Sequence, residues 1–376
     1  MAQKLEVALA AGGTAGHINP ALALAEELAD RGHHVRFFGQ PNRLEAKLVP
    51  EAGFELVTVH VTGFDRTRPW TGVTALVNAS RAERAIGKVF ASSPTPDVAM
   101  GFGAYVEVPL IRWCAKHDVP CMLHEQNSVP GLANKLMARH ASAVCVAVPA
   151  AREAFVGRVG EGGQVICTGN PVRRAVTSAT REGGREAFGI PADAELLVVF
   201  GGSLGARHVN QAVCACKDEL LSRANLHVIH STGAELFDEV CEALALTEDE
   251  AARWHMMPYI QNMGDALAAA DVVVSRAGAS SIAEIAALEV PSLLVPYPLA
   301  TGDHQTTNAR SLVDAGAAVL VPDDQLDGDV FPRELTALLD SSSKRDAMRE
   351  AARGMGQAKA AATLADQVES VAGRAQ

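Results

Sequence analysis

One pattern occurs twice in this chain: a short apolar run enters a glycine-rich turn, and a helical periodicity follows at once. The first copy runs through Leu5–Ala10 into Gly12–Gly16, and the second runs through Leu196–Phe200 into Gly201–Gly205. A buried strand, a tight turn and a helix in this order begin a βαβ unit, the building block of parallel sheets. Two such beginnings in 376 residues predict two α/β domains of similar plan.

Further short apolar runs complete the two predicted sheets. They are Val35–Gly39, Val98–Gly101, Pro120–His124 and Val144–Ala147 in the first half, and Val228–His230, Val272–Ser275 and Leu293–Pro296 in the second. The expected fold is α/β, with two Rossmann-like domains whose parallel sheets face a central cleft. We expect domains at residues 1–169 and 170–356, with a hinge at 168–171. The last helical segment, residues 357–376, is expected to pack back on the first domain.

The charge of the chain is unevenly distributed. Its net charge is −11, but residues 1–170 hold 16 Lys and Arg against 15 Asp and Glu, whereas residues 171–376 hold 17 against 29. The acidic total argues against general nucleic-acid binding, and only the near-neutral first half suits an anionic membrane surface. No stretch approaches the ~20 unbroken apolar residues of a membrane span, so we expect a soluble or peripheral protein. The seven cysteines contain no CxxC pair, which argues against a zinc site.

The first glycine turn, Gly12–Gly16, opens a helix and is followed by His17. Such a turn aims free main-chain N–H groups and the positive end of the helix dipole at an anion. It is not a dinucleotide fingerprint, because the GxGxxG spacing is absent and the second strand ends in Gly39 and Gln40 rather than in an acid. His17 has a suitable pKa for a general base, although a histidine that caps the helix or contacts a phosphate fits the pattern equally well.

Polar clusters also follow three later strands, where open α/β sheets bind their ligands. His124–Asn127 is the first. In the second, Ser275–Glu284, a small-residue turn opens a helix, and Glu284 either accepts both ribose hydroxyls or only favours the helix dipole. In the third, Asp303–Asn308, Gln305 either meets a sugar hydroxyl or belongs to an ordinary capped helix start. An acid-x-acid pair, Asp327 and Asp329, lies away from any glycine turn, so we expect no metal.

Two clusters in the first half combine basic residues with tryptophan. One comprises Arg66, Arg68 and Trp70, and the other comprises Arg112, Trp113, Lys116 and His117. Such mixtures suit a membrane interface, where the aromatic ring sits at headgroup depth, although surface helices often carry them.

Seven motifs in order along the chain resemble the MurG family, the UDP-N-acetylglucosamine transferases of peptidoglycan synthesis. They are GGTAGHINPALALA at Gly12–Ala25, GFGAYV at Gly101–Val106, HEQN at His124–Asn127, GNPVR at Gly169–Arg173, GGSLGAR at Gly201–Arg207, SRAGASSIAE at Ser275–Glu284 and DHQTTNA at Asp303–Ala309. The set is far more specific than any single motif. The resemblance implies a GT-B fold and a metal-independent, inverting transfer without a cofactor. N-acetylglucosamine would pass from UDP to the 4-hydroxyl of the N-acetylmuramoyl unit of lipid I, giving lipid II at the cytoplasmic membrane face.

The resemblance also assigns residues by matched position. His17 corresponds to the proposed general base, and Ile260 would read the uracil edge through its main chain. The donor site would be lined by Thr14, Ala15, Gly16, Asn127, Arg173, Ser203, Ile260, Ala279, Ser280, Ser281, Ile282, Ala283, Glu284 and Gln305. Ala15 and Ala104 stand where many relatives have glycine, and the methyl group of Ala15 is expected to narrow the space for the acceptor pyrophosphate. The alternatives are another GT-B enzyme, such as a lipid glycosyltransferase or a UDP-N-acetylglucosamine 2-epimerase, and a non-catalytic UDP-sugar-binding membrane protein.

Overall fold

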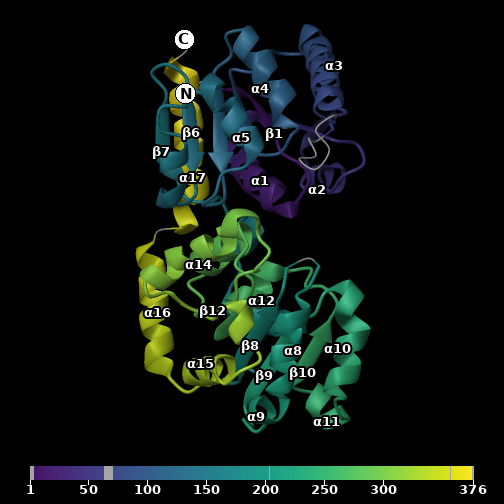
Figure 1. The fold of residues 1–376 in the computed structure, drawn as a ribbon, viewed down its shortest axis with the longest axis vertical. Helices are drawn as coiled ribbons and strands as arrows, with labels where there is room; N and C mark the ends of the chain where they lie inside the picture. Colours follow the sequence, from purple (N-terminus) through teal and green to yellow (C-terminus); the bar gives the residue numbers. More distant parts are fainter. Residues whose placement is uncertain (1–3, 63–70, 203, 356, 375–376) are drawn as a thin grey trace. The chain divides into compact units, whose positions relative to one another are not determined.

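The computed structural model describes residues 4–62, 71–202, 204–355 and 357–374, and the chain divides into two compact units (Figure 1). Unit 1 comprises the chain up to Arg173 together with the C-terminal stretch from Lys359. Unit 2 comprises Arg174–Ala358. The sequence had placed this boundary between residues 169 and 170.

Within its described residues, unit 1 holds a seven-stranded parallel sheet in the order β3-β2-β1-β4-β5-β6-β7. The strands are β1 (Glu6–Ala10), β2 (His34–Gly39), β3 (Glu55–Thr58), β4 (Val98–Gly101), β5 (Cys121–Glu125), β6 (Ala143–Val146) and β7 (Gln164–Cys167). The order reverses at β1, because β1 pairs with β2 on one side and with β4 on the other. Ligands of open α/β sheets bind at such a switch point, beyond the carboxyl ends of the strands.

Helices cover both faces of this sheet. They are α1 (Ala15–Asp30), α2 (Glu45–Glu51), α3 (Thr71–Ala91), α4 (Glu107–Lys116), α5 (Leu132–Met137), the 3₁₀ turns η1 (Ala138–His140) and η2 (Pro149–Ala154), and α17 (Ala360–Arg374). The C-terminal helix α17 lies against α1: Arg31 bonds Asp366 at 2.7 Å and Glu369 at 3.1 Å, and His33 lies 3.0 Å from Glu369. The last segment of the chain therefore belongs to the core of unit 1.

Unit 2 holds a six-stranded parallel sheet in its described residues, in the order β10-β9-β8-β11-β12-β13. The strands are β8 (Glu195–Phe200), β9 (Leu226–Ser231), β10 (Trp254–Met257), β11 (Val272–Ser275), β12 (Ser292–Leu294) and β13 (Ala318–Leu320). The reversal falls at β8, which begins the second copy of the strand–turn–helix pattern. Each glycine turn thus follows the strand at which the strand order of its sheet reverses.

The helices of unit 2 are short. They are α6 (Arg174–Thr177), α7 (Arg181–Phe188), α8 (Arg207–Ala215), α9 (Lys217–Leu221), α10 (Phe237–Leu244), α11 (Glu248–Ala251), α12 (Met263–Ala269), α13 (Ala279–Ala287), α14 (His304–Asp314), α15 (Val330–Leu339) and α16 (Ser342–Gly354), with 3₁₀ turns η3 (Ala234–Leu236), η4 (Thr301–Asp303), η5 (Asp323–Gln325) and η6 (Gln357–Lys359), the last crossing into unit 1. The helical segment that follows the second glycine turn breaks at Cys216, which caps the end of α8 and the start of α9.

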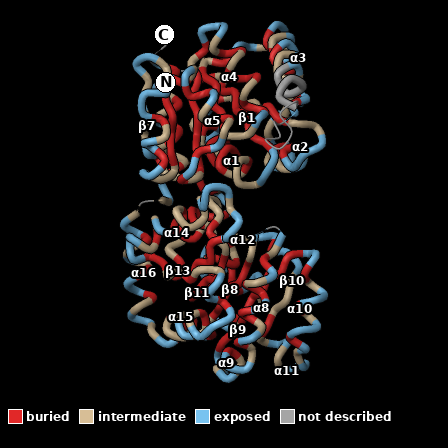
Figure 2. Tube along the Cα trace, in the orientation of Figure 1, coloured by how far each residue is buried: buried red, intermediate tan, exposed pale blue. Residues whose placement is uncertain are grey.

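The central strands are buried on both faces, as Figure 2 shows for each unit. Leu196–Phe200 of β8 has at most 2% of any side chain exposed. One apolar cluster lies on each side of each sheet, which explains why these strands read as unbroken apolar runs.

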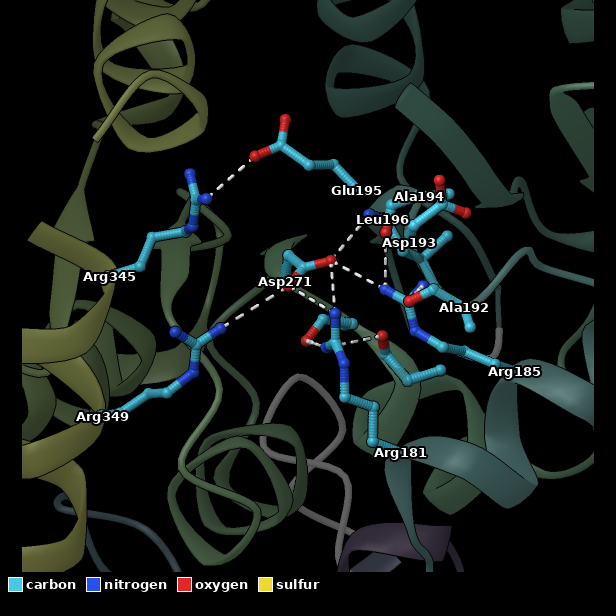
Figure 3. Close-up of polar contacts among 12 residues, drawn as sticks. Arg181, Arg185, Ala192, Asp193, Ala194, Glu195, Leu196, Asp271, Arg345 and Arg349 are labelled. Carbon is cyan, nitrogen blue, oxygen red and sulfur yellow. Dashed lines mark hydrogen bonds and ion pairs between the residues drawn. The ribbon is translucent and has the colours of Figure 1, made fainter. Parts of the chain in front are cut away.

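A charged network holds the amino-terminal end of the unit 2 sheet (Figure 3). Asp271 accepts two bonds from Arg181 at 2.8 and 3.0 Å, one from Arg185 at 3.0 Å and the N–H of Leu196 at 2.9 Å. This carboxylate joins α7 to β8 at the end of the unit opposite to the glycine turn. The network therefore stabilises the fold of unit 2 and lies away from the glycine turn.

Candidate active site

The first glycine turn begins α1 at the carboxyl edge of the unit 1 sheet, the edge at which its parallel strands end. Thr14 is the extended N-cap of α1, and its carbonyl accepts the N–H of His17 at 3.1 Å. The amides of Ala15 and Gly16 belong to the first helical turn, whose N–H groups have no partner within a helix. Thr14, Ala15, Gly16 and His17 are thus brought together at one helix start.

A buried carboxylate, not detected in the sequence, occupies part of this turn. Glu45 has no exposed surface, and it accepts the N–H of Gly13 at 3.0 Å and that of Gln40 at 2.9 Å. A Cβ on Gly12 would lie 2.4 Å from this carboxylate, so the turn requires glycine there. The expectation that the glycine turn presents free amides to an anion is therefore wrong for Gly13, because the chain itself supplies the anion.

His17 is half-buried, and its Nδ1 lies 3.2 Å from Thr14 Oγ1. Burial lowers its pKa below the usual 6.5, although Glu125, the Gly12 carbonyl and Glu45 each oppose the shift. The ring is consequently neutral at pH 7. When Nδ1–H donates to Thr14, Nε2 keeps a lone pair that can accept a proton.

The cluster His124–Asn127 proves to be mostly internal. His124 is fully buried and neutral, since burial lowers its pKa to about 4, and its Nε2 lies 3.0 Å from the Gly169 carbonyl. Glu125 accepts the N–H groups of Asn127 at 3.0 Å and Gly131 at 2.9 Å. Gln126 is buried as well. Only Asn127 of this cluster is half-exposed and placed to meet a ligand.

Arg173 lies in unit 1 and is already paired. Its Nε and Nη2 donate to one oxygen of Glu26 on α1 at 3.0 and 2.9 Å. The predicted donor contact would have to share this guanidinium with Glu26.

The second glycine turn precedes α8 in unit 2. Gly205 adopts a positive φ of 75°, and a Cβ there would lie 2.0 Å from the Thr232 carbonyl, so the turn packs directly on the backbone beyond β9. Ser203, a predicted donor ligand, lies outside the described residues.

The predicted run Ala279–Glu284 forms the first turns of α13, but its residues differ in what they can offer. Ala279, Ser280 and Ser281 occupy the first turn, and the Ser280 hydroxyl is buried without a partner among the described residues. Ile282 and Ala283 point into the core, and the N–H of Ile282 is bonded to Gly278. The side chains of these two residues are buried, and their place in the donor site stays a prediction.

Glu284 lies in the second turn of α13, half-buried, and no cation pairs with it among the described residues. Burial raises the pKa of its carboxyl to about 7. Such a group is poised to change charge near neutral pH. A ligand that donates hydroxyls to it favours the ionised form.

Gln305 lies in the first turn of α14 and has a fixed orientation. Its carbonyl oxygen accepts the N–H of Ala277 at 3.1 Å and that of Tyr297 at 2.9 Å. The amide NH2 is consequently the only part left to meet a ligand, and it can only donate. Ile260 is buried, with 1% of its surface exposed, and its main-chain contact with a base edge stays a prediction.

One member of the acid-x-acid pair, Asp327, lies beside a histidine. Asp327 lies 3.1 Å from Nε2 of His208, whose Nδ1 lies 2.8 Å from Asp323. Among the residues that the structure describes, no group of three His, Cys, Asp or Glu could hold a metal ion.

The prediction that Trp113 lies at a membrane interface is wrong. Trp113 is 8% exposed and packs between Phe90 and His117, with ring centroids 4.6 and 4.1 Å away. Arg112 and Lys116 both pair with Glu83. The first cluster, Arg66, Arg68 and Trp70, lies outside the described residues.

A basic face that sequence reasoning missed lies instead on α3. Val77, Arg81, Arg84 and Lys88 are exposed and share one side of this helix by their spacing of three and four residues. The helical spacing of Arg81, Arg84 and Lys88, in a segment with Glu83 as its single acid, could have revealed this face. No described helix is both long and apolar enough to cross a bilayer.

The chain is similar in sequence and in fold to known glycosyltransferases. Residues 7–146 match the glycosyltransferase family 28 N-terminal domain, and residues 196–368 match the family 28 C-terminal domain. The UDP-N-acetylglucosamine--N-acetylmuramyl-(pentapeptide) pyrophosphoryl-undecaprenol N-acetylglucosamine transferase of Halothermothrix orenii is 35% identical over 98% of this chain and 99% of its own length. The structure of MurG from Acinetobacter baumannii is similar, with a TM-score of 0.71 and 26% identity over 98% of this chain and 100% of that one. The calicheamicin glycosyltransferase CalG4, at 19% identity over 99% of each chain and a TM-score of 0.70, shares the fold.

Proposed function

Because this chain belongs to the MurG family of UDP-N-acetylglucosamine transferases, we propose that it forms lipid II. It transfers N-acetylglucosamine from UDP-N-acetylglucosamine to the 4-hydroxyl of the N-acetylmuramoyl unit of lipid I. The fold is of the GT-B type, with two Rossmann-like units. The observation that carries the proposal is 35% identity over nearly the full length of a transferase of this kind.

Unit 2 binds the donor in this proposal. The opening turns of α8 and α13 receive the diphosphate, whose charge is favoured at helix amino ends. Glu284 accepts the ribose hydroxyls, Gln305 donates to a sugar oxygen, and the main chain of Ile260 reads the uracil edge. The unpartnered Ser280 hydroxyl at the start of α13 supports this role, because a buried hydroxyl normally has a partner.

His17 serves as the general base. Its Nε2 takes the proton of the acceptor hydroxyl while that oxygen bonds to C1 of the sugar and the bond from C1 to the diphosphate breaks. One displacement inverts the configuration at C1, and UDP leaves with the electron pair. The neutral ring and the Thr14 contact that orients it support this role. No metal takes part, since the helix amino ends stabilise the leaving charge.

Unit 1 also binds an anionic membrane surface at the cytoplasmic face, where lipid I is reached. The basic face of α3, comprising Arg81, Arg84 and Lys88 beside Val77, supports this part of the proposal. Cosedimentation with vesicles of phosphatidylglycerol should exceed that with phosphatidylcholine and fall when all three cations become glutamine. Equal binding to both vesicles would contradict it.

A transfer assay tests the enzymatic proposal directly. The chain is incubated with UDP-N-acetylglucosamine and a soluble lipid I analogue, with and without a chelator, and the products are separated. Disaccharide formation with and without chelator is expected. Epimerised sugar in the absence of acceptor would identify the 2-epimerase alternative, and binding without turnover would identify the non-catalytic one.

A further inference from the structure

The first residue of α4, Glu107, is a buried carboxyl group to which neither the family resemblance nor the proposed reaction assigns a role. Its side chain has no exposed surface. Its Oε2 accepts the N–H of Gly103 at 2.6 Å, and a Cβ added to Gly101 would lie 2.4 Å from the same oxygen. Glu107 therefore both packs on the Gly101–Gly103 turn and fixes it by a hydrogen bond.

This turn lies directly beside the proposed base. Gly103 has a φ of 90°, and a Cβ placed on it would lie 3.5 Å from Cδ2 and 3.6 Å from Nε2 of His17, and 3.2 Å from the amide nitrogen of Asn134. His17 therefore lies close to Gly103, and a side chain at this position would meet the edge of the ring that carries Nε2. Moving the turn would move the base or open space beside it.

The second oxygen of Glu107 faces no donor. Glu107 Oε1 is buried without a hydrogen-bond partner among the described residues, as are the side-chain oxygens of Gln126 and Asn134. Burial raises the pKa of Glu107 to about 8; the Gly103 N–H opposes this rise, and the negative charge of Glu125 adds to it. The carboxyl therefore carries a proton at pH 7.

The titratable groups around the turn come from three neighbouring elements. Glu125 and His124 lie at the end of β5, and the His124 ring packs on Phe102 with centroids 5.5 Å apart. His17 comes from α1, and Glu45 from α2 lies close enough to His17 to affect its pKa. Ionised Glu107 would add a second carboxylate beside Glu125.

We propose that Glu107 is a positioning residue for the acceptor half of the transfer, holding the Gly101–Gly103 turn beside His17. The inference rests on the proposed function, in which the acceptor carries a diphosphate. The neutral state matters because a further negative charge at this edge would repel that diphosphate. Gln at this position keeps the acceptor for the Gly103 N–H and cannot ionise.

The test compares Glu107→Gln and Glu107→Ala, with Glu83→Gln as a matched control that removes a carboxylate contacting α4 away from the turn. Steady-state constants are measured with the soluble lipid I analogue from pH 7 to pH 9. For Glu107→Ala at pH 7 we expect kcat/KM for the acceptor to fall by about 10–100-fold with donor KM unchanged. Glu107→Gln and Glu83→Gln should match the wild type at pH 7. The wild type and Glu83→Gln should lose acceptor affinity as pH rises through about 8, and Glu107→Gln should not.

The positioning role is overturned if Glu107→Gln loses as much activity as Glu107→Ala, or if its alkaline decline equals that of the wild type. Where Glu107→Ala does not fold, the pH profile of Glu107→Gln decides. Hydrogen exchange at the Gly103 amide supplies a readout independent of turnover. Protection of this amide from exchange should be lost in Glu107→Ala and kept in Glu107→Gln. Unchanged protection in Glu107→Ala would contradict the proposal. A wild type without transferase activity would contradict the proposed function alone.

Discussion

The two glycine turns follow equivalent strands, yet the carboxyl edges of the two sheets have different chemistry. In unit 1 the amides around the turn are held by the chain's own buried carboxylates, Glu45 and Glu125. In unit 2 the corresponding amides, those of Ala277 and Tyr297, are held by an uncharged group, the Gln305 carbonyl. An edge that already contains carboxylates favours proton chemistry, whereas an edge of bare helix starts favours phosphate.

This difference runs against the overall charge of the two halves. Unit 2 comes from the strongly acidic half of the sequence, and unit 1 from the near-neutral half. The acids of unit 2 are largely on its surface or in pairs such as Asp271 with Arg181 and Arg185 (Figure 3). The net charge of a domain therefore says little about the charge of its site.

The largest effect should come from the base of unit 1. We expect His17→Ala to lower kcat by roughly 10²–10⁴-fold, because general-base catalysis is lost, while the Kd for UDP-N-acetylglucosamine stays unchanged. His60→Ala, an exposed histidine of the same unit, is the control. A comparable loss of donor binding would identify His17 as a phosphate ligand. The carboxyl edge of unit 1 would then bind phosphate as that of unit 2 does.

The donor edge is tested by Glu284→Ala. Losing hydrogen bonds to a charged group should weaken binding of UDP-N-acetylglucosamine by about 1.5–3 kcal/mol, measured by calorimetry. Because burial raises the pKa of Glu284 to about 7, wild-type affinity should increase from pH 6 to pH 8 as the carboxyl ionises. The variant should show no such increase. An unchanged Kd would remove Glu284 from the ribose role.

The role of Glu45 can be separated from ligand binding. Glu45→Ala leaves the Gly13 and Gln40 amides without a partner and should destabilise unit 1 by about 1–3 kcal/mol in urea unfolding. Glu55→Ala, at an exposed ion pair with Arg36, should cost no more than roughly 1 kcal/mol. If Glu45→Ala instead gained affinity for phosphate or UDP, the first turn would be an anion site that Glu45 blocks.

The smallest effect concerns His208 at the edge of unit 2. Its hydrogen bond to Asp323 is the main cause that raises its pKa above 6.5, so the folded state favours the protonated ring. The resulting stability is fully present below about pH 6.5 and is lost as pH rises through the raised folded pKa. His208→Gln should therefore lower Tm at pH 6 and not at pH 9, by the equivalent of roughly 0.2–1 kcal/mol. An equal change at both pH values would show that packing, not charge, holds this contact.

Sequence reasoning found the central strands because they are buried on both faces. The runs at β1, β4, β8 and β11 are continuous apolar segments, and such a signal needs no knowledge of neighbours. It missed β3, β7, β10 and β13, which are the edge strands of the two sheets, are only three or four residues long and consist mostly of half-buried or exposed residues. Their strand conformation depends on the pairing partner, which the local sequence does not encode.

The sequence by itself determined the repeated strand–turn–helix plan, the motif order and, through them, the family, because each is a local or linear pattern. Tertiary structure alone decided which amides remain open. Glu45 reaches Gly13 across 32 residues, and Glu107 reaches Gly103 only because the chain turns back there. The orientation of α13 likewise decided that Ile282 and Ala283 are buried whereas Glu284 is only half-buried. The physical reason is that burial and hydrogen-bond partnership, which set charge and availability, are properties of packed neighbours rather than of residue type.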